Sequence, residues 1–212
     1  MSAPQSYYVP VDAGEAEFTE KRSRFLGHVR RVETEAEART FLDEMRKKYY
    51  DARHNCWCYV LREGGVVRYG DDGEPQGTAG QPMLNVFQRE GVENVVCVVT
   101  RYFGGVLLGA GGLTRAYAKS AKDALDAAGK ARMRLWSAVT VDCPYPLLER
   151  LKLLAAAHGG TVEGTDFGAA VSVRILLPQE NAAGFDAALT ELSAGTMTAR
   201  REGERFLPGP RE

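Results

Sequence analysis

The pattern of apolar positions predicts a buried strand, a glycine-rich loop and a helix over residues 95–128. Val95–Val99 is an unbroken apolar run rich in β-branched residues, short enough for a central strand. After the loop, apolar residues recur with helical spacing from Leu113 to Leu125. The first turn of a helix has backbone N–H groups without intrahelical partners, and an anion can bind there. The sequence therefore predicts a candidate anion site, and a tight strand-to-helix turn is the structural alternative.

The pattern of apolar and polar positions also predicts the elements before this segment. Residues 17–32 read as one strand with basic residues in it, and residues 1–13 as a loose lead-in. Thr34 and Glu37 form a capping-box pattern at the start of a helix with one apolar face. Strands at 54–61 and 66–70 flank a Gly-Gly turn, and residues 83–91 suit a short helix.

The second half of the chain shows a separate, regular order of predicted strands and helices. The polar segment KARMR after Gly129 marks the predicted domain boundary, which gives a first domain at 14–134 and a second at 135–207. Beyond it, strand-like and helix-like segments follow in the order βαββαβ, which is that of the ferredoxin-like unit. No group of residues in this half suggests catalysis.

Composition limits the classes of function. The chain has 212 residues and a net charge of −1, so no global field attracts nucleic acid, although residues 1–134 are slightly basic and 135–212 acidic. We expect no membrane segment, no secretory signal and a cytoplasmic location. The cysteines lie in apolar strand-like runs, which favours reduced, buried thiols over a metal site: Cys56, Cys58, Cys97 and Cys143.

The candidate chemistry lies in and around the glycine loop. The known glycine-rich nucleotide-binding motifs do not match this loop. Thr114 stands where the dinucleotide-binding fingerprint needs glycine, and the Gly-Lys-Ser/Thr triplet of a P-loop does not follow. Basic and aromatic residues flank the glycines, and Phe103 or Tyr117 are further candidates for stacking. The predicted nucleic-acid- or phosphate-binding residues are Arg101, Tyr102, Gly104, Gly105, Gly109, Gly111, Gly112, Arg115, Lys119 and Lys122.

An acidic loop, DDGEPQGTAGQP, is the second candidate feature. Its carboxylates suit either a hard cation or ion pairs with Arg68 or Arg101, and the ion pairs are favoured because the spacing is not that of a calcium loop. We expect this loop to fold back beside the glycine loop, since both are too elaborate for ordinary connectors. The resulting composite site would contain His54, Asp71, Asp72 and Glu74.

Long blocks of the chain resemble the IMPACT/YigZ family. The blocks are HNCW, DDGEPQGTAGQP, VVTRYFGGVLLGAGGLTRAYAKS and KRSRF, and the likeness covers nearly the whole chain. The resemblance implies an α+β, two-domain protein. Its first domain would have the βαβ-type mixed sheet with helices on one face that is found in the fourth domain of elongation factor G and in small-metabolite kinases. Its second would be ferredoxin-like, similar to that factor's fifth domain.

Three functions follow from these observations. The resemblance and the basic loop favour a cytosolic RNA- or ribosome-binding protein related to translational control. A protein-interaction module of translational control without a ligand comes second. A small-molecule phosphate-binding enzyme comes last, because no nucleophile has an evident partner and no metal signature is present. The sequence predicts no cofactor, no catalytic residue and no bound metal.

Overall fold

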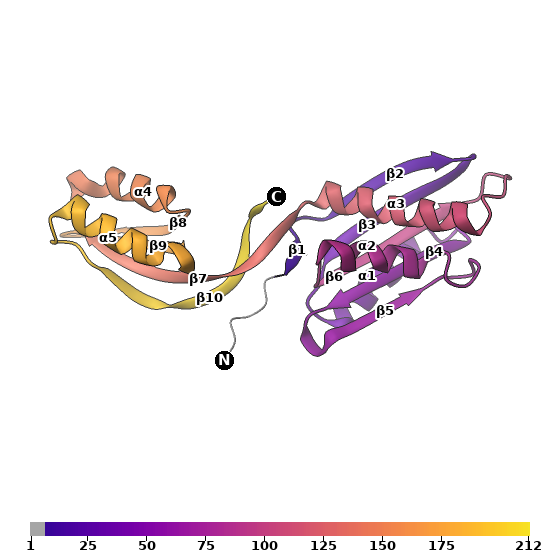
Figure 1. Cartoon of the computed structure of the whole chain (residues 1–212), viewed down its shortest axis with the longest axis horizontal. Helices are drawn as coiled ribbons and strands as arrows, with labels where there is room; N and C mark the ends of the chain where they lie inside the picture. The colour runs from indigo at the N-terminus through magenta and orange to yellow at the C-terminus, as the bar shows by residue number, and fades with distance from the viewer. Residues whose placement is uncertain (1–6) are drawn as a thin grey trace. The chain divides into compact units, whose positions relative to one another are not determined.

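The protein, described here by a computed structural model over residues 7–212, divides into two compact units (Figure 1). Unit 1 comprises the chain up to Met133 together with Pro208–Glu212, and unit 2 comprises Arg134–Leu207. Each unit contains strands and helices, so the predicted α+β, two-domain class is confirmed.

Unit 1 is built on a five-stranded sheet with the order β2-β3-β6-β4-β5. Its strands are β2 (Gly14–Glu20), β3 (Ser23–Arg31), β4 (His54–Leu61), β5 (Val66–Gly70) and β6 (Val95–Tyr102). All four pairings are antiparallel, so this sheet is not the mixed sheet that the resemblance implied. The apolar run at Val95–Val99 is the central strand, as predicted, since β6 pairs with both β3 and β4.

Helices cover both faces of this sheet. On one face, α1 (Glu35–Lys48) packs its apolar residues against Tyr59, Val96 and Val98. On the other, α2 (Gly80–Glu90) and α3 (Ala110–Ala128) pack over the alternate strand residues, including Cys97. The expected one-sided arrangement is therefore wrong, because side chains alternate along β4 and β6 and each face presents an apolar surface that needs cover.

Local signals explain where several elements begin. The predicted capping box at α1 is present, since the Thr34 hydroxyl accepts from the Glu37 amide and the Glu37 carboxylate accepts from the Thr34 amide. Residues 17–32 form a hairpin rather than one strand, because Lys21 and Arg22 take positive φ values and reverse the chain between β2 and β3. A short 3-10 turn, η1 (Glu63–Gly65), joins β4 to β5.

The predicted lead-in at 1–13 is partly wrong. Strand β1 (Tyr8–Pro10) pairs antiparallel with residues Lys130–Arg132 of β7 (Lys130–Cys143). The segment KARMR is accordingly strand rather than a polar bridge. The part of the lead-in at residues 1–6 lies outside the described residues.

Unit 2 follows the predicted βαββαβ order. After β7 come α4 (Leu148–Ala157), β8 (Thr161–Phe167), β9 (Val171–Pro178), α5 (Ala182–Ser193) and β10 (Ala199–Arg211), with short 3-10 turns η2 (Tyr145–Leu147) and η3 (Gln179–Asn181). Strand β7 lies between β10 and β9, and β8 is next to β9. Both helices pack over one apolar core that includes Leu151, Ile175 and Phe185. The ferredoxin-like prediction is confirmed.

All four cysteines are buried, as expected from their strand positions. Within residues 7–212, no helix is long and apolar enough to cross a bilayer.

Candidate functional site

The acidic loop is organised by one carboxylate. Asp71, directly after β5, accepts backbone N–H groups from Gly77 (2.8 Å), Ala79 (3.1 Å) and Gly80 (2.8 Å). The last two belong to the start of α2, whose own cap residue, Ala79, has no side chain that can accept a hydrogen bond. Asp71 therefore acts as the N-cap of α2 from a distance, and its oxygens are occupied by the protein itself.

Asp72 ties the loop to β4. Its carboxylate accepts the Asn55 amide at 2.6 Å, and its carbonyl oxygen lies 2.9 Å from Nδ1 of His54. Asn55 in turn accepts the Thr100 hydroxyl at 2.7 Å, so the contact continues to β6. His54 is thus held by a backbone carbonyl rather than by a carboxylate.

Glu74 makes the ion pair that the sequence offered as one alternative. Its Oε1 accepts Nη1 of Arg101 at 2.7 Å and the Tyr117 hydroxyl at 2.8 Å. The side chains of Glu74 and Arg101 are only 3% and 6% exposed. Arg101 also donates to Ser23 Oγ at 3.3 Å, whereas its buried Nε has no hydrogen-bond partner in the described structure. Burial is the largest cause that raises the pKa of the Tyr117 hydroxyl, which therefore stays protonated and donates to Glu74.

These contacts place the acidic loop beside the glycine loop. Glu74 precedes α2, Arg101 lies in the last two residues of β6 and Tyr117 lies on α3, so a single carboxylate joins three elements. The polar atoms of this buried cluster are hydrogen-bonded within the protein, apart from Arg101 Nε. Such a network is typical of a structural contact that fixes several elements together. The sequence had suggested that Arg101 is a free cation for phosphate. It is not, because Glu74 neutralises it.

Different local constraints explain why glycine stands at several positions of the loop. A Cβ at Gly104 would lie 2.0 Å from the backbone carbon of Arg22, so only glycine allows the β2–β3 turn to approach. Gly105 and Gly109 take φ values of 82° and 73°. A Cβ at Gly112 would lie 2.9 Å from Leu108, and one at Gly111 would lie 3.4 Å from Nη1 of Arg115. The Gly111 distance is an ordinary van der Waals contact, so the Arg115 guanidinium does not require glycine there.

A cavity of about 370 Å³ lies at the start of α3. Helix α3 begins after Gly109 with no side-chain cap and no acidic residue in its first turn. Polar lining comes from Arg53, His54, Glu74 and Arg101, and the apolar lining includes Phe103, Leu107 and Leu113. The predicted residues His54, Glu74, Arg101 and Gly109 are thus brought to one hollow, whereas Asp71 and Asp72 do not line it.

The predicted cationic stripe on α3 is largely neutralised. Lys119 pairs with Asp123, and Lys122 pairs with Asp126 and also lies 3.8 Å from Glu90. These pairs have i,i+4 spacing, which leaves little net charge on this helix face. Within residues 7–212, no carboxylate forms an ion pair with Arg115 or with Arg53. These two arginines are free cations beside the start of α3, and Lys21 is a third cation without an ion pair among the described residues.

The aromatic residues differ in access. Tyr117 is fully buried and cannot stack on a base. The Tyr102 hydroxyl donates to Asp51 at 2.7 Å, a bond that raises the pKa of Tyr102 to about 12, and its ring lies beneath the Arg24 guanidinium. Phe103 is 49% exposed and lies 5.5 Å from the guanidinium of Arg101.

Sequence reasoning missed Arg53 and Ser23, which have no motif of their own. Arg53 directly precedes His54 at the start of β4, and that adjacency was the one available signal. Within the described part of the chain, no group of three or more His, Cys, Asp or Glu residues could hold a metal ion.

The sequence matches two protein-domain families and several known proteins. The Impact N-terminal domain family matches residues 21–125, and a domain of unknown function, DUF1949, matches residues 141–196. The IMPACT family member YvyE of Bacillus subtilis is 36% identical over 94% of this chain and 92% of its own length. The IMPACT family member YigZ of Escherichia coli is 34% identical over 84% of this chain and 88% of its own length.

A solved structure agrees with these sequence matches. The crystal structure of a hypothetical protein aligns with a TM-score of 0.59 and 32% identity, and the match covers 92% of this chain and 97% of that one. The likeness in sequence therefore extends through both units of the fold. This chain belongs to the IMPACT family.

Proposed function

We propose that the protein binds RNA through unit 1, with a backbone phosphate at the first turn of α3. The observation that carries the proposal is the cavity in which the uncapped start of α3 lies beside Arg53, an arginine that pairs with no carboxylate of the described residues. A helix N-terminus carries a partial positive charge and free N–H groups, which stabilise a phosphate.

Two unpaired arginines give the proposed site its net charge. Arg53 lines the cavity, and Arg115 lies one turn into α3 and lines a neighbouring hollow of about 170 Å³ together with Lys21. Phosphate contacts of this kind supply affinity without sequence information. Phe103, half-exposed at the cavity, offers a ring against which a base can stack.

The resemblance to the IMPACT/YigZ family supports the biological setting of this proposal. It implies a cytosolic protein related to translational control, with ribosomal RNA as a suitable test ligand. The domain types shared with elongation factor G support contact with the ribosome by analogy of fold.

Filter binding of ribosomal RNA at several salt concentrations tests the proposal. Each lost phosphate contact on a single strand should reduce the slope of log affinity against log salt by about 0.7. We therefore expect Arg53→Ala and Arg115→Ala each to flatten the slope by about that amount. Lys122→Ala is the matched control and should bind as wild type, because Asp126 and Glu90 already neutralise Lys122.

Two results would contradict the proposal. Unchanged affinity and slope in both arginine variants would show that this end of α3 is not the RNA surface. A wild-type protein that binds no RNA even at low salt would remove RNA binding altogether.

A protein partner is the second candidate, and the glycine loop itself favours it. Leu107 is 81% exposed, Phe103 49% and Val106 38%, so one loop presents three large apolar side chains to solvent. Apolar loops of this kind are typical of protein contacts. Replacing Val106, which does not line the cavity, with the uncharged Ser should leave the RNA salt slope unchanged and weaken a protein complex, which separates the two functions.

A further inference from the structure

We propose that a second hollow of unit 1, between α1 and β4, binds an unpaired base of single-stranded RNA. This inference rests on the proposed RNA binding and adds a place where a base, rather than a phosphate, is held. The hollow has a volume of about 360 Å³ and is lined by Arg39, Leu42, Asp43, Arg46, Trp57 and Tyr59. Its size falls within the range of small-ligand pockets in proteins.

An aromatic pair on β4 provides the stacking surface. The rings of Trp57 and Tyr59 lie 5.5 Å apart with an interplanar angle of 13°, so the two side chains share one ring orientation. Gly70, opposite Trp57 on β5, leaves space for the indole, since a Cβ there would lie 2.6 Å from its Nε1. Helix α1 alone covers this face of the sheet, which leaves the indole partly exposed at the edge of the helix.

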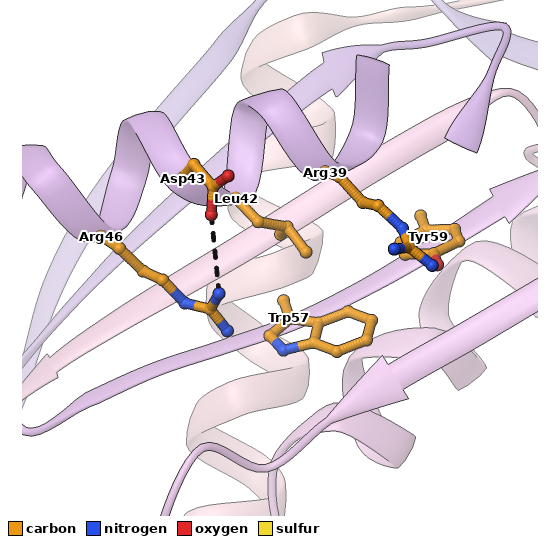
Figure 2. Close-up of a pocket in the computed structure, with 6 residues that line it drawn as sticks. All are labelled: Arg39, Leu42, Asp43, Arg46, Trp57 and Tyr59. Carbon is orange, nitrogen blue, oxygen red and sulfur yellow. Dashed lines mark ion pairs between the residues drawn. The ribbon is translucent and has the colours of Figure 1, made fainter. Parts of the chain in front are cut away.

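The arginines of α1 are directed to the same hollow. Figure 2 shows Arg39, Leu42 and Arg46 extending from the helix toward the two aromatic side chains. Arg39 is engaged, because it donates to Glu35 at 2.8 Å, and the Tyr59 hydroxyl donates to the same oxygen at 2.8 Å. Arg46 has only a long contact of 3.7 Å to Asp43 and is half-exposed, so it is available to a ligand.

Charge selects an anionic ligand over a neutral one. Arg68, exposed on β5 opposite Tyr59, does not line the hollow, but it lies close enough to Glu35 to lower the pKa of that carboxyl. It therefore adds a positive charge at the rim to those of Arg39 and Arg46, and the two carboxylates there are Glu35 and Asp43. The rim therefore carries one net positive charge beside an aromatic floor. A base on the floor with its phosphate near Arg46 or Arg68 satisfies both features, and bases stack on aromatic side chains whatever their sequence.

Fluorescence isolates this hollow, because the chain has two tryptophans, one in each unit. In the Trp136→Phe variant the only indole is Trp57. We titrate this variant with a uridylate oligomer and with an abasic oligomer of the same ribose-phosphate length. We expect the uridylate oligomer to quench Trp57 and to bind about 5- to 100-fold more tightly than the abasic oligomer, which should leave the emission unchanged.

Substitutions add a second measurement. In the otherwise wild-type chain, Trp57→Ala should remove most of the difference in affinity between the uridylate and abasic oligomers, and Trp57→Phe should keep most of it. Phe167→Ala removes an exposed aromatic ring from unit 2 and serves as the control that leaves affinity unchanged. The quenching measurement keeps the native Trp57, so the proposal stays testable if Trp57→Ala does not fold.

The outcomes separate this inference from the proposed function. Equal affinity of both oligomers with a normal salt slope would overturn the base site and leave RNA binding in place. If neither oligomer binds, the proposed function fails, and titration with free uridine monophosphate decides whether Trp57 still binds a nucleotide. A response of Trp57 to a proline-rich peptide but not to any nucleotide would overturn the inference and identify a peptide groove.

Discussion

The two units of this protein bury polar groups to very different extents. Among the described residues, unit 2 buries only small hydroxyl side chains of this kind, namely Ser137, Thr140 and Ser193. Unit 1 buries charged and amide groups as well, including Glu74, Arg101, Asn55 and Asn94. Burying such groups costs free energy unless each is hydrogen-bonded, so they persist where they join elements together.

This difference indicates which interactions stabilise the fold of each unit. Unit 2 has one apolar core between its sheet and two helices, in which no charged side chain is needed among the described residues. Unit 1 has loops that carry no apolar core of their own, and carboxylates connect them to the sheet: the buried Glu74, the half-buried Asp71 and the exposed Asp72. Unit 1 should therefore be sensitive to single polar substitutions, and unit 2 to losses of apolar volume.

The largest effect is expected at Glu74. Replacing it with Ala leaves Arg101 buried without its partner, which should lower the free energy of unfolding of unit 1 by about 3–5 kcal/mol. In unit 2, Phe185→Ala should cost about the same through lost packing. Urea denaturation followed by the emission of Trp57 and of Trp136, each in the variant lacking the other indole, measures the two units separately.

The double replacement Glu74→Leu with Arg101→Met is the control for this comparison. It removes both charges and should cost less than Glu74→Ala alone, because no buried charge is left unpaired. A Glu74→Ala variant within about 1 kcal/mol of wild type would show that the buried pair does not hold the two loops together.

A smaller loss is expected at Asp71. The Asp71→Ala substitution leaves three backbone N–H groups without their acceptor and should cost about 2–3 kcal/mol, since two of the three lie in the part-buried start of α2. The same denaturation experiment measures this loss. Glu63→Ala in the exposed turn η1 is the matched control and should unfold as wild type; an Asp71 variant equal to it would contradict the capping role.

The third effect depends on pH. Burial is the largest cause that lowers the pKa of His28 below its usual value, while Glu15 at 3.3 Å opposes the shift and Lys48 adds to it. Because the folded state holds His28 neutral, its contribution to stability is complete above a pH of about 6.5, the unfolded pKa, and is lost as the pH falls through the lowered folded pKa. Urea midpoints measured from pH 7.5 down to 5 should fall for unit 1.

His28→Gln sharpens this result, because it removes the titrating ring from the same site. In that variant the part of the decline due to His28 should disappear. Unit 2 provides the internal comparison: no histidine is among its described buried residues, so its Trp136 transition should change less over this range.

The smallest effect is expected at an exposed ion pair of unit 2. Arg174 pairs with Asp166 on neighbouring strands, and both side chains are more than half exposed. Surface pairs of this kind contribute little, and salt screens them. Asp166→Asn should leave the unfolding transition unchanged within error, and a clear loss would mean that unit 2 also depends on charged contacts.

The sequence predicted elements well where the pattern is local. The Thr34–Glu37 capping box, the β-branched run at Val95–Val99 and the βαββαβ order are confirmed because each depends on neighbouring residues. The pairing of Lys119 with Asp123 was missed, although its i,i+4 spacing is visible in the sequence.

The sequence could not show partners that are distant along the chain. Arg101 and Glu74 are 27 positions apart, so nothing in the local pattern showed which of several arginines the carboxylate would bury. The hairpin at Lys21 and Arg22 was missed because non-glycine residues with positive φ give no strong signal. Independent folding of the second domain stays a prediction, and expression of residues 135–212 followed by thermal unfolding checks it.

The reach of Asp71 also limits how the chain can change in length. Its carboxylate must span from the end of β5 to the amides of Gly77 and Gly80, so an inserted residue between them would break the cap rather than lengthen a slack connector. Most surface loops tolerate insertion at little cost. For a fused peptide tag or a grafted epitope, the turn at Glu63–Gly65 is the better position, because Gly65 has open space around it and Gly64 only Val66 nearby.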